Sequence, residues 1–166
     1  MENRYPCIQP TKEEDSTVDD SIEKTIDLKA SIDRVWRAVT DHKEFGEWFR
    51  VALEKPFEVG EMTSGNITYP GYEHMRLEAV VKTMDRKSLF AFTWCPAPDN
   101  TGNAPINSME TLVEFKLEAI ESGTRLTIIE SGFTALPGDA DAAEALLRNA
   151  EGWEIQTQNI AAHVED

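Results

Sequence analysis

The sequence is poor in cysteine and has no long apolar run. Its 166 residues include two cysteines, Cys7 and Cys95, which are too few for a disulfide framework and lack CxxC spacing. Cys95 ends a strand-like run and is interpreted as a small apolar filler rather than a nucleophile. No stretch approaches the roughly 18 apolar residues of a membrane span. The first residues, MENRYPCIQPTKEEDS, lack the apolar segment of a secretory signal, so the expected compartment is the cytosol.

Basic residues are also scarce. The chain has 16 lysines and arginines against 31 aspartates and glutamates, which gives a formal net charge of −15. Such a surface repels nucleic-acid phosphates and anionic lipids, so neither nucleic acid nor membrane is expected as a partner. High acidic charge mainly favours solubility, and attraction of a basic protein partner is the alternative interpretation.

The motifs of several enzyme classes are missing. The three histidines, His42, His74 and His163, have neither His-x-His nor HExxH spacing, so no metal site is expected. His42 and His163 are expected on polar helix faces. The sequence has no GxGxxG, P-loop or GxSxG motif, so it gives no support to nucleotide binding or serine hydrolysis, and no cofactor is expected.

The longest regular pattern is the last stretch, Asp139 to Asp166. Its apolar and small residues recur at steps of three or four and therefore share one helical stripe. They are Ala143, Leu146, Ala150, Trp153, Thr157, Ile160 and Val164. One long amphipathic helix is predicted, with a bend or a close approach to another element at Gly152, because glycine within a helix costs about 1 kcal/mol relative to alanine.

Most of the remaining chain alternates at the period of two that is typical of strands. A strand over 21–29 is followed by two short helices, the first capped by Ser31 and the second by an Asp41-x-x-Glu44 pattern. About six further strands follow in antiparallel order, with Gly65 expected to mark a bulge or a close approach. Their approximate ranges are 49–54, 60–69, 72–84, 88–94, 109–120 and 125–131. Residues 1–20 are expected to form a disordered or loosely attached arm, and 21–166 a single domain.

This order predicts an α+β fold in which a strongly curved antiparallel sheet wraps one long helix. Several large side chains are expected to face the enclosed space from the sheet and the helix. They are Phe90, Phe92, Trp94, Phe115 and Trp153. A well-packed core and an apolar small-molecule pocket are both compatible with this set. A ligand, if bound, is expected between Trp153 and the strand 90–94.

Three polar residues are candidates for proton transfer. Glu130 shares the parity of Leu126 and Ile128 on a strand, so it points inward unless curvature carries it to a solvated rim, which is the favoured interpretation. Tyr69 and His74 flank the Pro70-Gly71 turn together with Tyr72 and Glu73. They are expected beside the mouth of the enclosed space, where they can bind a polar ligand head or simply stabilise the turn.

Four segments resemble the START/Bet v 1-like superfamily, also called SRPBCC, and within it the group similar to activator of Hsp90 ATPase homologue 1. They are Val35-Trp36 with the helix at 41–48, the strand 90–94, the stretches 123–127 and 131–133, and Gly152-Trp153 with the helix end at 160–165. Together they extend over about residues 20–166. The resemblance implies a helix-grip fold, with a sheet of about six to seven strands around the C-terminal helix and a cavity for an apolar or amphipathic molecule.

The favoured function is therefore binding of a small apolar or amphipathic molecule. The alternatives are a chaperone- or stress-linked interaction protein, and a cyclase- or hydrolase-like enzyme using Glu130, His74 or Tyr69. A chaperone and a second copy of the chain are the protein partners considered. The candidate ligand contacts combine the inward aromatic residues with groups near the turn and on the helices. They are Trp36, Tyr69, Tyr72, His74, Phe90, Phe92, Trp94, Phe115, Phe133, Trp153 and Thr157.

Overall fold

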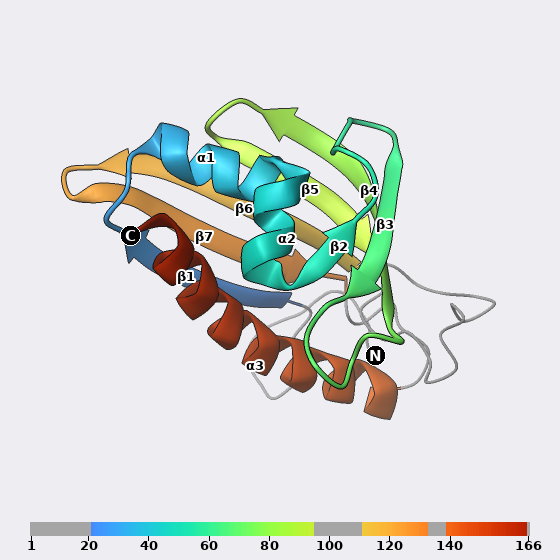
Figure 1. The fold of residues 1–166 in the computed structure, drawn as a ribbon. Coiled ribbons are helices and arrows are strands. Elements are labelled where there is room, and N and C mark those ends of the chain that lie inside the picture. Colours follow the sequence, from blue (N-terminus) through green and yellow to red (C-terminus); the bar gives the residue numbers. More distant parts are fainter. Residues whose placement is uncertain (1–20, 95–110, 133–138, 166) are drawn as a thin grey trace.

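The computed structural model describes residues 21–94, 111–132 and 139–165, with side chains described from residue 149 onward in the last segment. The expectations for the arm 1–20, Cys7, Cys95 and Phe133 lie outside these residues. The described residues form seven strands and three helices (Figure 1). In chain order they are β1 (Ser21–Leu28), α1 (Ile32–Thr40), α2 (His42–Phe49), β2 (Val51–Leu53), β3 (Met62–Ile67), β4 (Arg76–Asp85), β5 (Leu89–Trp94), β6 (Thr111–Ile120), β7 (Gly123–Ser131) and α3 (Asp139–Val164).

The strands form one antiparallel sheet in the order β1-β7-β6-β5-β4-β3-β2. Strands β2 to β7 follow one another as a meander. The first strand, β1, forms the other edge of the sheet and pairs with the last strand, β7. The helices lie against one side of the curved sheet, with α3 running along it as a single long rod (Figure 1). The predicted α+β arrangement of a curved sheet around a long C-terminal helix is confirmed.

The two short helices begin where the sequence predicts. The hydroxyl of Ser31 accepts a hydrogen bond from the backbone N–H of Arg34, and the carboxylate of Asp41 accepts from the N–H groups of Lys43 and Glu44. Such caps satisfy backbone donors that have no partner in the first helical turn. At the end of α2, Arg50 adopts a left-handed conformation with φ 73°, which turns the chain into β2.

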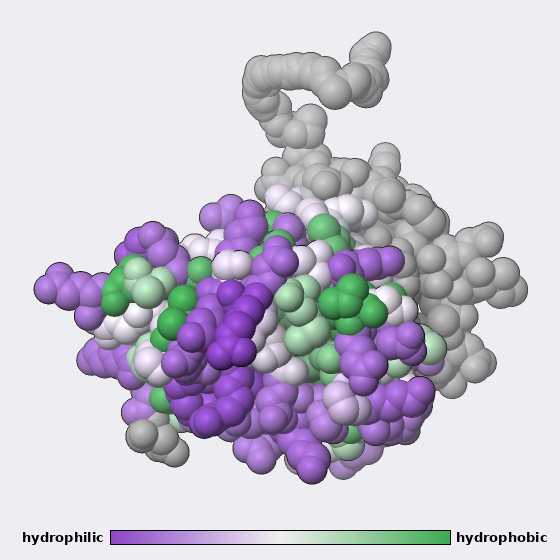
Figure 2. All heavy atoms as spheres, turned by 90° about the horizontal axis from the view of Figure 1, so that it is seen from above, coloured by the Kyte–Doolittle hydropathy of each residue, from purple (hydrophilic) through white to green (hydrophobic). Residues whose placement is uncertain are grey.

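The core lies between the sheet and the three helices. Along α3 the predicted stripe is buried at Trp153, Thr157, Ile160 and Val164. On the sheet, alternate residues face inward because successive side chains of a strand point to opposite faces. Seen from above the view of Figure 1, the described surface is mostly hydrophilic, with apolar residues in small groups (Figure 2).

Gly65 and Gly152 differ in the space around them that a side chain could occupy. A Cβ atom on Gly65 would lie 2.0 Å from the carbonyl oxygen of Ala52, so the predicted close approach is confirmed at this glycine. A Cβ atom on Gly152 would meet nothing within 4 Å among the described residues, so of the bend or close approach expected in α3 the close approach is not found. No described contact requires glycine at this position.

We expect Gly152→Ala to raise the free energy of unfolding by about 0.5 to 1 kcal/mol, because alanine restricts the unfolded chain and favours the helix. Gly65→Ala is the matched comparison and should lower it by about 1 to 3 kcal/mol through overpacking against β2. Urea denaturation of both variants measures the two changes. A destabilised Gly152→Ala protein would show that α3 makes a close contact at this position.

Candidate functional site

Glu130 is a fully buried carboxylate at the inner face of the sheet. It follows Leu126 and Ile128 at steps of two on β7, and all three side chains are buried. Glu130 pairs with Ile22 of β1 and Val113 of β6, so both neighbouring strands cover it. The expectation that strand curvature carries Glu130 to a solvated rim was wrong, because β7 is an interior strand of the sheet and α3 covers its inner face.

Four side chains donate hydrogen bonds to Glu130. Its Oε1 atom accepts from Trp153 Nε1 at 2.8 Å and from Asn149 Nδ2 at 3.0 Å. Its Oε2 atom accepts from Thr111 Oγ1 at 2.5 Å, Trp94 Nε1 at 2.7 Å and Asn149 Nδ2 at 3.1 Å. A carboxylate has about four lone-pair positions, so these donors occupy its whole accepting capacity.

The donors come from three different elements. Thr111 begins β6 and pairs with Trp94 at the end of β5, so their side chains share one face of the sheet. Asn149 and Trp153 are four residues apart on α3 and lie on one helical face. Glu130 thus connects the end of β7 to the helix that packs against it.

An aromatic cluster adjoins this carboxylate. The rings of Trp94 and Trp153 stack with centroids 5.7 Å apart and an interplanar angle of 26°. Trp153 also meets Phe115 edge-on at 5.8 Å and Phe49 of α2 at 6.1 Å. Phe92 continues the cluster along β5, with its ring centroid 5.4 Å from that of Trp94. In this structure the region between Trp153 and the strand 90–94 is therefore filled by direct ring contacts.

The candidate residues at the Pro70-Gly71 turn lie at the surface. Tyr69 and Tyr72 are 53% and 52% exposed, and His74 is exposed as well. Tyr69 contacts the guanidinium of Arg50, and the carboxylate of Glu73 accepts a hydrogen bond from the backbone N–H of Gly71. These contacts stabilise the turn. Tyr69 and His74 thus lack the burial that proton transfer in an apolar interior requires, and as ligand contacts they stay predictions.

The other predicted ligand contacts lie on the helices and the sheet. Phe90, Phe92 and Phe115 are buried in the core, and Trp36 of α1 is half-buried against it. Thr157 is buried too, and its hydroxyl donates to the backbone carbonyl of Glu154 within α3. Sequence reasoning missed Asn149 and Thr111. The spacing of Asn149 four residues before Trp153 was the available signal.

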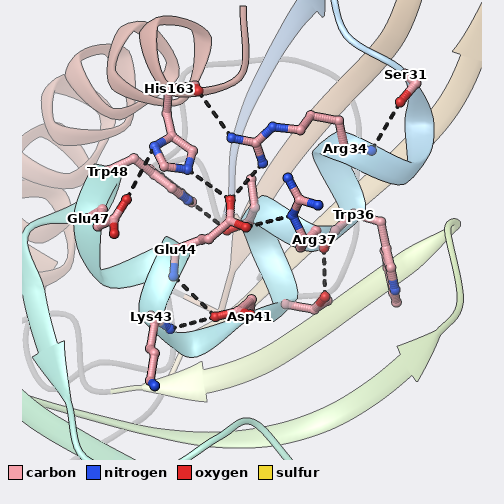
Figure 3. Close-up of polar contacts among 12 residues, drawn as sticks. Ser31, Arg34, Trp36, Arg37, Asp41, Lys43, Glu44, Glu47, Trp48 and His163 are labelled. Carbon is pink, nitrogen blue, oxygen red and sulfur yellow. Dashed lines mark hydrogen bonds and ion pairs between the residues drawn. The ribbon is translucent and has the colours of Figure 1, made fainter. Parts of the chain in front are cut away.

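A second polar cluster joins the three helices around Glu44 (Figure 3). Arg34 Nη1 and Arg37 Nε lie 2.6 Å from the two carboxylate oxygens of Glu44, and His163 Nε2 lies 3.0 Å from Oε1. Arg34 also donates to the backbone carbonyl of His163 at 3.3 Å. His163 was expected on a polar face of α3, and its polar partners there are on the other two helices. The imidazole is largely enclosed and fixes the C-terminal end of α3 to α1 and α2.

The sequence profile of the family described as "Activator of Hsp90 ATPase homolog 1-like protein" matches residues 29–165, which include every described element except β1. The chain belongs to this family. The resemblance inferred from the four sequence segments is thereby confirmed. No curated protein matches the chain.

Many solved structures share the fold of this family member, and three of them are described here. A protein from Arthrobacter aurescens has a TM-score of 0.73 and 22% identity, over 90% of this chain and 89% of that chain. The Aha1 dimer from Colwellia psychrerythraea has a TM-score of 0.66 and 18% identity, over 87% and 96%. DynU16, described as a putative protein in the dynemicin biosynthetic locus, has 0.69 and 22%, over 89% and 48%. This chain therefore spans about half of DynU16. These likenesses confirm the helix-grip fold.

The described part of this family member offers no cluster of three or more histidine, cysteine, aspartate or glutamate residues placed to hold a metal ion. None of the helices in the described segments is long and apolar enough to cross a membrane.

The Glu44 cluster predicts a defined pH dependence of stability. Burial opposes ionisation of Glu44, but its contacts with His163, Arg34 and Arg37 outweigh burial, and the pKa of Glu44 lies below its usual value of 4.5. A depressed pKa in the folded protein stabilises it above the unfolded value, and this stabilisation is lost as the pH falls through the folded value.

We expect Glu44→Gln to lower the free energy of unfolding by about 1 to 2 kcal/mol near neutral pH, since Glu44 is partly exposed. The difference from the unaltered protein should shrink as the pH falls below 4.5 and then through the depressed pKa of Glu44 in the folded protein, where the wild-type carboxylate becomes protonated. Urea denaturation at a series of pH values tests this, with the exposed Glu58→Gln as control. A Glu44→Gln protein with an unchanged pH profile would show that the cluster does not stabilise the fold.

Proposed function

We propose that this protein binds a small apolar or amphipathic molecule between the sheet and α3. The observation that supports the proposal is that an aromatic cluster lies in direct contact with a buried polar group. Trp94 and Trp153 stack on one another, and both donate to the buried carboxylate of Glu130. Small-molecule sites are mostly apolar and contain a few placed polar groups that orient the ligand.

The ring contacts determine how a ligand enters. Since Trp153 lies directly on Trp94 and Phe115, a ligand reaches this region only when Trp153 separates from β5 and β6. α3 then acts as the lid of the site, and the cluster around Glu44 and His163 keeps its C-terminal end attached. A helix held at one end can move away from the sheet at the other without losing its place in the fold.

The test is to purify the protein under native conditions, extract it with organic solvent and identify the extract by mass spectrometry. We expect one class of apolar or amphipathic molecule in a fixed ratio to protein. The emptied protein should then bind 8-anilinonaphthalene-1-sulfonate, and re-addition of the extract should displace this dye. Trp94→Ala should weaken dye binding, whereas the surface variant Ile155→Ala on α3 should not. An empty extract together with no dye binding would overturn the proposal.

A chaperone-linked interaction is the second candidate, favoured by the family's description and by the net charge of −15. The Colwellia relative is described as a dimer, so a second copy of this chain is a further partner to consider. Affinity capture at low and high salt tests the interaction, and light scattering tests self-association. Salt-sensitive capture of a basic partner would favour this candidate, and failure to recover one would count against it.

A further inference from the structure

We infer that Glu130 selects ligands whose polar end donates hydrogen bonds, above all a protonated amine, and that this end binds where the amide of Asn149 now lies. The inference rests on the proposed function and specifies its ligand class as an amphipathic amine. Glu130 is 0% exposed, and its carboxylate bonds to two tryptophans of the aromatic cluster.

The partners of Glu130 determine what kind of group it accepts. Trp94 Nε1, Trp153 Nε1 and Asn149 Nδ2 can only donate, and Thr111 donates through its hydroxyl. A site built from donors around a carboxylate suits the ionised form, and it leaves no role for a ligand atom that only accepts hydrogen bonds.

The described side chains around Glu130 do not balance its charge. Its four partners are all neutral, and none of the lysine, arginine and histidine side chains that the structure describes bonds to it. Buried charges in proteins are normally paired, since removing an ion from water carries a large cost. A cationic ligand supplies the missing partner, and an anionic ligand would place two like charges in the same interior.

Asn149 marks the position that a ligand can take. Its amide nitrogen is the one donor in this set that reaches both carboxylate oxygens, at 3.0 and 3.1 Å. Asn149 and Trp94 are half-buried, whereas Thr111 and Trp153 are buried. The amide is therefore one of the two donors that solvent can approach, and the one that spans both oxygens. An ammonium group with several N–H donors can replace it there. The alkyl or aryl body then extends along Trp94 and Trp153.

Three probes with the same chain and different ends test this: octylamine, 1-octanol and octanoate. Their affinities for the emptied protein are measured by isothermal titration calorimetry near neutral pH and at physiological salt. We expect octylamine to bind about tenfold more tightly than 1-octanol, the difference typical of one charge-assisted hydrogen bond. Octanoate should bind most weakly.

Three variants separate the buried carboxylate from the general acidity of the protein. Glu130→Gln should abolish the preference for octylamine while 1-octanol still binds. Glu151→Gln makes the same change of charge at an exposed position of α3 and should keep the preference. Asn149→Ala should tighten octylamine binding, because the probe no longer competes with the amide.

The outcomes also separate this inference from the proposed function. If all three probes bind wild type with similar affinity, the amine preference is overturned and the proposed function stands. If none of them binds and the extract is empty, the proposed function falls as well. If Glu151→Gln loses the preference as fully as Glu130→Gln, surface charge explains it and Glu130 does not select the ligand. If Glu130→Gln fails to fold, an unchanged octylamine affinity in Asn149→Ala overturns the inference.

Discussion

Replacement of Glu130 by alanine is expected to lower the free energy of unfolding by about 3 to 5 kcal/mol. The change removes one acceptor that is shared by the donors of Trp94, Thr111, Asn149 and Trp153. All four of these residues are buried or half-buried. An apolar residue that fills the same volume can replace a buried charge at little cost. Alanine cannot do this, because it leaves a cavity and removes the acceptor from the buried donors of Thr111 and Trp153.

Urea denaturation followed by far-ultraviolet circular dichroism measures this loss. Glu78→Ala is the control, since Glu78 is an exposed glutamate on β4, and it should change stability by less than about 0.5 kcal/mol. A loss below about 1 kcal/mol for Glu130→Ala would mean that the four donors have other partners, and the carboxylate would not be the connection between sheet and helix.

The second large effect is expected at Trp153. Trp153→Ala should lower the free energy of unfolding by about 3 to 5 kcal/mol, because it removes a 2% exposed indole and leaves a cavity against Trp94, Phe115 and Phe49. Trp153→Phe keeps an aromatic ring and removes the hydrogen bond to Glu130, so it should lose only about 1 to 2 kcal/mol.

The difference between the two variants separates packing from hydrogen bonding. Ile155→Ala is the matched control on α3, since Ile155 is 59% exposed, and it should leave stability almost unchanged. Equal losses for Trp153→Ala and Trp153→Phe would assign the whole contribution to the Nε1 hydrogen bond. A small loss for both would contradict the docking of α3 through Trp153.

Much of the fold is predictable from local patterns. The stripe that includes Trp153, Ile160 and Val164 identifies the buried side of α3, and Ser31 and Asp41 mark the starts of α1 and α2. These signals are predictable because helix period and capping depend on residues that are close in sequence. The pairing of β1 with β7 depends on strands about 100 residues apart and follows only from the three-dimensional arrangement.

The candidate site is less predictable for the same reason. Strand parity places Glu130 on the inner face with Leu126 and Ile128, but parity carries no information about burial at the end of a strand. Burial depends on β1, β6 and α3, and the donors come from β5, β6 and α3. Likewise, the side of α3 that carries His163 is polar in sequence, and its enclosure depends on Glu44 of α2.

The central claim is that a ligand binds between α3 and the sheet at Trp94 and Trp153. Indole N–H signals in a ¹H–¹⁵N correlation spectrum test it most directly, because the chain has four tryptophans that can be assigned by substitution. Trp94 and Trp153 donate to Glu130, whereas Trp48 donates to the backbone carbonyl of Ala38. Saturation with octylamine or 1-octanol should shift the signals of Trp94 and Trp153 and leave that of Trp48 in place. If neither probe moves the Trp94 and Trp153 signals, the site between α3 and the sheet is contradicted.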